Sequence, residues 1–83
     1  MNLIILPNAK KEIKKLPSLQ RETILRKLFS IKNNPLRYIE RLQDSRLWKL
    51  RIGEYRAILM INTKDQVINV IKVGHRKNIY KQI

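Results

Sequence analysis

The last stretch of the chain, VGHRKNIYKQI at residues 73–83, combines side chains that can handle protons and phosphates without a metal. His75 can accept or donate a proton near neutral pH, Arg76 can bind phosphate oxygens in bidentate fashion, and Tyr80 carries a phenol. No carboxylate in this segment balances its cations. The composition of the segment favours a site for a polyanion.

A second basic cluster lies in LWKLRIGEYR, residues 47–56. If Gly53–Glu54 forms the turn of a hairpin, Arg51 faces Arg56, and Lys49 lies two positions away on the same face, opposite Ile58. Like charges directly opposite each other destabilise a sheet. An anion bound between them would explain the pair, but both guanidinium groups could also extend into water at little cost.

These residue types are compatible with RNA cleavage by the 2′-hydroxyl of the substrate itself. Such a reaction needs positive charge at the phosphate, a base for the 2′-hydroxyl and an acid for the 5′-oxygen. The candidates for the charge are Arg51, Arg56 and Arg76. The candidates for proton transfer are Lys49, Tyr80 and His75. Tyr80 could equally pack on the core, and His75 could equally be a solvated turn residue.

Other chemistries have little support in the sequence. Its six acidic residues are scattered, there is one histidine and no cysteine, and two glycines cannot form a glycine-rich phosphate loop. We therefore expect no metal and no cofactor.

Composition sets the class of the protein. The 83 residues suffice for one domain spanning 1–83, and a formal net charge of +13 attracts polyanions, nucleic acid first among them. The lack of cysteine fits a reducing, cytoplasmic setting. No apolar run is long enough to span a membrane, and the N-terminal residues do not form a signal peptide. We expect no membrane partner.

The first half of the chain predicts one strand and two helices. Residues 2–6 are an apolar run closed by Pro7. Asn8 is a suitable N-cap for a helix that ends before Pro17, and Ser18 can cap a second helix that stops at residues 33–35. Both helices carry apolar stripes that need a partner surface.

The second half predicts a three-stranded meander. Residues 36–46 are mixed, with a helical turn expected near Tyr38. Strands follow at 47–52, 54–62 and 66–73, and Gly74 is expected to break the third. The fold class is therefore α+β, an antiparallel sheet with an N-terminal helical hairpin packed on one face. The open face would then carry Lys49, Arg51 and Arg56.

With these residues in view, the chain resembles the RelE/ParE superfamily of type II toxin–antitoxin toxins, as an archaeal or bacterial RelE-like member. The stretches that match, in the family's order, are ILPNAKKEIKKLP, NNPLRYIERLQDSRLWKLRIGEYRAI and VGHRKNIY. The resemblance implies a microbial-RNase-like fold. It also implies a toxin that cleaves mRNA in the ribosomal A site and so inhibits translation.

By position, the resemblance assigns phosphate stabilisation and acid–base chemistry to a set of residues in this chain. They are Lys49, Arg51, Arg56, Arg76 and Tyr80. Some family members carry another lysine where this chain has Leu47, which leaves the general base to Lys49, Tyr80 or His75.

The resemblance also implies a partner, an acidic RelB-like antitoxin that folds on contact, and a toxin–antitoxin heterotetramer. Its apolar side chains would anchor on the helical hairpin, and its acidic groups would neutralise the cationic face. Two other functions stay open. One is a ParE-like DNA gyrase poison of the same fold, and the other is a non-catalytic nucleic-acid-binding module.

Overall fold

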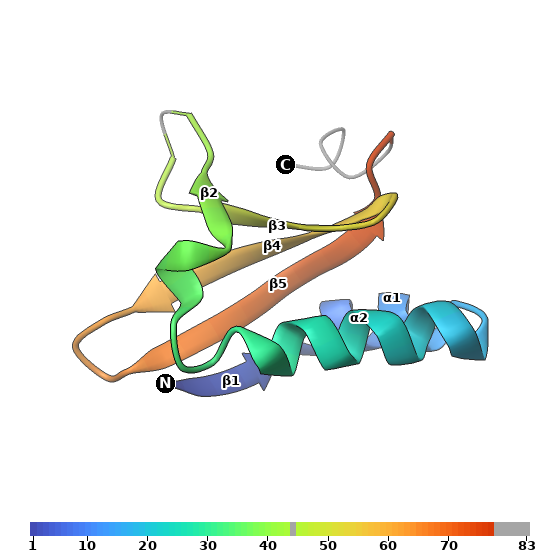
Figure 1. The fold of residues 1–83 in the computed structure, drawn as a ribbon, viewed down its shortest axis with the longest axis horizontal. Helices are drawn as coiled ribbons and strands as arrows, with labels where there is room; N and C mark the ends of the chain where they lie inside the picture. The colour runs from blue at the N-terminus through green and yellow to red at the C-terminus, as the bar shows by residue number, and fades with distance from the viewer. Residues whose placement is uncertain (44, 78–83) are drawn as a thin grey trace.

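The computed structural model describes residues 1–43 and 45–77, in which two α-helices cover one face of a five-stranded sheet (Figure 1). The elements are β1 Asn2–Ile5, α1 Pro7–Lys14, α2 Ser18–Ser30, a 3-10 turn η1 Pro35–Arg37, β2 Ile39–Arg41, β3 Trp48–Ile52, β4 Tyr55–Asn62 and β5 Val67–His75. This arrangement confirms the predicted α+β class with the helical hairpin on one side. Within the described residues, no helix is long and apolar enough to cross a membrane.

The sheet has the strand order β1-β5-β4-β3-β2. The meander β3-β4-β5 is antiparallel as expected, and β2 extends it antiparallel at one edge. At the other edge β1 pairs parallel to β5, so the sheet is mixed rather than wholly antiparallel. A parallel partner requires a crossover, which begins here with the two helices that follow β1.

The core lies between the helices and the sheet. Its fully buried side chains come from both layers and include Ala9, Ile13, Ile24, Leu28, Ile31, Leu50, Ala57, Leu59, Ile68, Val70 and Val73. The apolar stripes expected on both helices therefore meet the inward-facing positions of the strands, as strand alternation requires.

Both helices begin one or two residues earlier than predicted. Helix α1 starts at Pro7 with Leu6 as its N-cap, and α2 starts at Ser18 with Pro17 as its N-cap. The proposed caps Asn8 and Ser18 therefore lie inside the helices. Proline accounts for the first case, because its fixed φ and missing N–H suit the first helical position.

The helical turn expected near Tyr38 is present as η1, which ends at Arg37, but strand β2, which was not predicted, follows it and pairs with β3 through Ile39 and Leu50. One further prediction was wrong, because Gly74 does not break the last strand: β5 continues to His75, and Gly74 pairs with Arg56. Pairing with a neighbouring strand outweighs the weak local signals in both places.

Candidate active site

The β3–β4 hairpin has the predicted register. Gly53 has a φ of 59° at the first turn position, a conformation that glycine adopts without strain. Across the hairpin Arg51 pairs with Arg56, and Lys49 pairs with Ile58. Leu50 and Ile52 of β3 are buried in the core, so Lys49 and Arg51 lie on the opposite, open face of the sheet, as predicted.

The open face carries two transverse rows of residues. The row nearer the turn contains Arg51 on β3, Arg56 on β4 and Gly74 on β5. Glycine has no side chain, so it leaves room beside Arg56 on the third strand. Arg51 is exposed and Arg56 is half-buried. Two guanidinium groups on adjacent strands therefore share one surface, which suits a phosphate with several anionic oxygens.

The second row contains Glu40, Lys49, Ile58 and Lys72 on β2 to β5. Lys49 Nζ lies 3.4 Å from Glu40 Oε2, and the lysine side chain is 27% exposed against 77% for the glutamate. Ile58 is 1% exposed although it faces away from the helices. The register sets a half-buried lysine on each side of this isoleucine, so part of each alkyl stem lies over an apolar surface.

Glu40 and Lys72 are absent from the residues that the sequence suggested. Glu40 was missed because β2 has only three residues, too few for a period of two to be recognised. A signal did exist for Lys72, the one charged side chain in the apolar run VINVIKV. A carboxylate beside Lys49 matters chemically, because it can hold the ammonium group in place or exchange a proton with it.

His75 lies apart from these rows. It pairs with Tyr55, which packs against the core, so its side chain is on the helix side of the sheet. The two rings make an edge contact with centroids 5.7 Å apart. Nε2 lies 3.5 Å from Glu54 Oε2, and Nδ1 accepts a hydrogen bond of 3.3 Å from the backbone N–H of Lys77. Both ring nitrogens are thus engaged away from Lys49.

Arg76 follows at the turn that leaves β5. Its backbone N–H donates to the carbonyl of Glu54 at 2.8 Å, which fixes this turn against the β3–β4 hairpin. The exposed Arg76 is therefore at the same end of the sheet as Arg51 and Arg56. The predicted Tyr80 lies outside the described residues. Among the described residues, no three His, Asp or Glu side chains gather into a metal-binding group.

A groove separates helix α2 from the hairpin. One part has a volume of about 290 Å³ and is lined by residues such as Leu19, Ile24 and Tyr55. The adjoining part, about 460 Å³, runs between Lys27 and Arg51. Leu19 is 71% exposed, although it is apolar. The groove thus combines an uncovered apolar end with a cationic end next to the open face.

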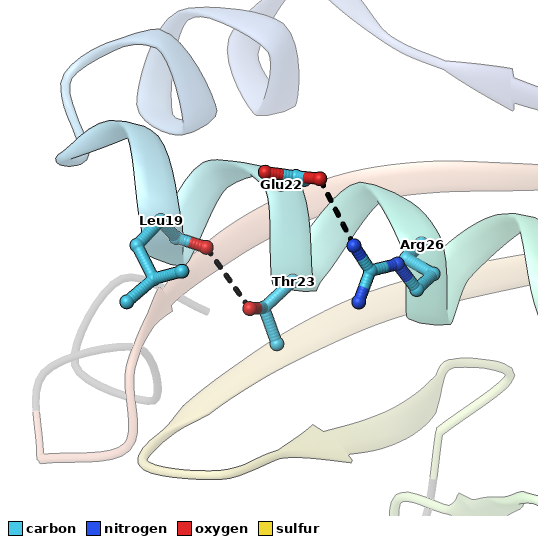
Figure 2. Close-up of polar contacts among 4 residues, drawn as sticks. All are labelled: Leu19, Glu22, Thr23 and Arg26. Carbon is cyan, nitrogen blue, oxygen red and sulfur yellow. Dashed lines mark hydrogen bonds and ion pairs between the residues drawn. The ribbon is translucent and has the colours of Figure 1, made fainter.

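The residues of α2 beside this groove are held by contacts within the helix (Figure 2). The hydroxyl of Thr23 donates to the carbonyl of Leu19 at 2.9 Å, and Arg26 pairs with Glu22 at 2.9 Å. Both members of the ion pair are largely exposed, so the pair adds little to stability. The cations that line this part of the groove are Arg26, Lys27 and Arg51, and of these Arg26 is paired with Glu22.

Comparisons with known proteins agree with this geometry. A protein-family model described as "ParE toxin of type II toxin-antitoxin system, parDE" matches residues 3–80. The E. coli toxin RelE, solved as an arginine double mutant in the free state, is 30% identical, with a TM-score of 0.76 and coverage of 95% of this chain and 86% of that one. No match was found among curated protein sequences.

Two toxin–antitoxin complexes also share the fold. The intact E. coli RelBE complex aligns at 29% identity and a TM-score of 0.73, covering 89% of this chain and 94% of that one. A RelBE complex from Mycobacterium tuberculosis aligns with a TM-score of 0.82 at 22% identity, covering 90% and 96%. The latter identity establishes similarity of fold alone.

Proposed function

The chain belongs to the RelE/ParE superfamily of type II toxin–antitoxin toxins, and on that basis we propose that it is a RelE-type endoribonuclease that cleaves mRNA in the ribosomal A site. The observation that carries the proposal is the Arg51–Arg56 pair with Lys49 in the adjacent row of the open face. Like charges directly opposite each other destabilise a sheet, and a phosphate bound between these two arginines would offset their repulsion.

The proposed reaction needs no metal, because the substrate supplies its own nucleophile. Arg51 and Arg56 bind the scissile phosphate and stabilise the charge that develops in the transition state, and Arg76 closes the same end of the site. Lys49 and Tyr80 transfer the protons of the 2′-hydroxyl and the 5′-oxygen. Glu40 positions the Lys49 ammonium group. The location of His75 on the helix side favours a structural role for it.

The test is primer extension on an mRNA programmed into 70S ribosomes, with naked mRNA as a control. Wild-type protein is expected to cut at A-site codons, whereas Arg76→Ala and Tyr80→Phe lose cleavage. Lys11→Ala removes one charge from an exposed position on α1 and should cleave normally. Absence of cleavage by folded wild-type protein on cognate ribosomes would rule the proposal out.

A ParE-like poison of DNA gyrase is the second candidate, because the matching family model is that of ParE toxins. This function needs no acid–base set, so it predicts gyrase inhibition that survives Tyr80→Phe. A supercoiling assay with purified gyrase distinguishes it from the nuclease. A protein that only binds nucleic acid would be inactive in both assays and would bind RNA with strong salt dependence.

We further propose that an acidic, RelB-like antitoxin inhibits the protein by occupying the groove along α2. Exposed Leu19 offers an anchor for its apolar side chains, and Arg51 at the other end attracts its carboxylates. Two of the similar structures are complexes of a toxin with such an antitoxin. A structure of the complex in which the antitoxin stays away from Arg51 and Arg76 would contradict inhibition by charge masking.

A further inference from the structure

A second hollow lies at the end of the sheet away from the β3–β4 hairpin. It has a volume of about 620 Å³, and we call it the distal pocket. The described residues that line it include Leu36, Arg41, Arg46, Trp48, Met60 and Lys64. Along β4, Met60 is four residues from Arg56, or about 13 Å at the usual rise of a strand. The pocket is therefore separate from the arginine row, and although Trp48 directly precedes Lys49 in β3, strand alternation places their side chains on opposite faces of the sheet.

The distal pocket combines positive charge with a cation–π pair. Arg41, Arg46 and Lys64 are exposed cations, and none of the described residues that line the pocket is acidic. The guanidinium of Arg41 lies over the Trp48 ring, 5.3 Å from its centroid. Its Nε donates to the carbonyl of Ser45 at 3.1 Å, which fixes the plane of the guanidinium group. An exposed guanidinium plane on an aromatic ring is a surface on which a nucleobase stacks.

Apolar and amide groups complete the pocket. Leu36 is 61% exposed and Met60 is 42% exposed, which are high values for such side chains. Asn69 adds an amide that can bond to the edge of a base. The acidic residue of the β4–β5 turn, Asp65, accepts a hydrogen bond of 2.9 Å from Asn62, so part of its hydrogen-bonding capacity is used locally.

We propose that the distal pocket binds a segment of single-stranded RNA, with a base on the Arg41–Trp48 pair and phosphates at Arg46 and Lys64. An acidic peptide would match the cations but has no nucleobase to place on the Arg41–Trp48 pair. The choice of RNA rests in part on the proposed function, since a ribosome-dependent nuclease must hold RNA beyond the scissile bond. Binding in the distal pocket nevertheless requires neither ribosomes nor cleavage.

The chain offers its own reporter, because Trp48 is its single tryptophan. The experiment titrates the full chain with a 2′-O-methyl oligonucleotide of about 12 nucleotides, a length within the range that single-strand binding sites cover. We expect quenching of Trp48 fluorescence. In the double variant Arg46→Ala/Lys64→Ala, we expect the affinity for the oligonucleotide to fall by about tenfold. The slope of log affinity against log salt concentration should become shallower by about 1.4, that is, by about 0.7 for each lost phosphate contact.

The matched control is Lys10→Ala/Lys11→Ala, which removes the same charge from α1 and should leave quenching nearly unchanged. Equal weakening in both variants, or no quenching by RNA, would overturn the proposal. A poly-glutamate peptide that quenches Trp48 as strongly as RNA would overturn it in favour of an acidic protein partner. Thermal unfolding of each variant verifies that it is folded.

The outcome is independent of the primer-extension test. If RNA quenches Trp48 fluorescence but the protein never cleaves mRNA, the proposed RNA binding in the distal pocket stands and the proposed nuclease function is overturned. If the protein cleaves mRNA on ribosomes but RNA does not quench Trp48 fluorescence, the nuclease function stands and RNA binding in the distal pocket is overturned.

Discussion

At the scale of single residues, the central feature is a charge placed where it does not help the fold. Arg51 faces Arg56 across the hairpin, and the exposed arginine lies on the face without helices. A substitution at such a position tests whether the residue binds a ligand or stabilises the fold. A ligand-binding residue should affect activity much more than stability.

Arg51→Ala is expected to lower cleavage by about 10²-fold or more, the usual loss when a group that stabilises transition-state charge is removed. The free energy of unfolding should change by less than about 0.5 kcal/mol, since the position is exposed and its cross-strand neighbour has the same charge. Single-turnover cleavage on ribosomes and urea unfolding measure the two effects. Parallel losses of activity and stability would show that Arg51 acts through the fold.

For His75 we expect the opposite pattern. His75→Gln should retain cleavage within about threefold, because the imidazole lies on the helix side and its nitrogens contact Glu54 and Lys77. The measurement is the same primer extension, with Lys11→Ala as the reference for a harmless substitution. A loss as large as that of Arg51→Ala would return His75 to the catalytic set.

At the scale of secondary-structure elements, the β3–β4 hairpin determines the geometry of the site. Its two-residue turn sets the register that brings Arg51 and Arg56 together, and a slip of one residue would turn every side chain of a strand to the other face. The turn depends on Gly53, whose φ of 59° is unfavourable for residues with a Cβ atom.

Gly53→Ala is therefore expected to reduce the free energy of unfolding by about 1–2 kcal/mol. The strain would come from the backbone, since an added Cβ meets no atom within 4 Å. Glu54→Ala, at the next turn position where φ is not positive, should cost less than about 0.5 kcal/mol. Equal effects of the two substitutions in urea unfolding would contradict the role given to the turn conformation.

At the scale of the whole molecule, the net charge of +13 acts on every part of the chain. It attracts RNA or an acidic antitoxin from a distance, but its self-repulsion opposes the compact state. The Arg26–Glu22 ion pair, which could offset part of this repulsion, is exposed and weak.

Salt should accordingly stabilise the free protein. The unfolding temperature is expected to rise between about 0.05 and 0.5 M sodium chloride, because screening shortens the reach of the repulsion. The variant Lys10→Gln/Lys11→Gln/Lys14→Gln, which removes three charges from α1, should show a smaller rise. Thermal unfolding followed by circular dichroism measures both, and a fall in stability with salt would mean that attractive pairs dominate.

Features that depend on neighbours along the chain could be predicted from the order of the residues. Apolar spacing predicted both helices, alternation predicted β3, and apolar runs predicted β4 and β5. The Gly53–Glu54 turn predicted the register of Arg51 and Arg56. The start of α1 differs from the prediction, because proline at position 7 favours the first helical turn more strongly than Asn8 acts as a cap.

Features that depend on distant partners could not be predicted in this way, because they form when separate segments of the chain meet. The parallel pairing of β1 with β5, the short strand β2 beside Lys49 and the continuation of β5 through Gly74 all arise from backbone hydrogen bonds to other segments. The same is true of His75, whose place on the helix side follows from its pairing with Tyr55. The distal pocket also arises in this way, since it joins Leu36, Trp48 and Lys64 from separate elements, and no local pattern encodes such a meeting.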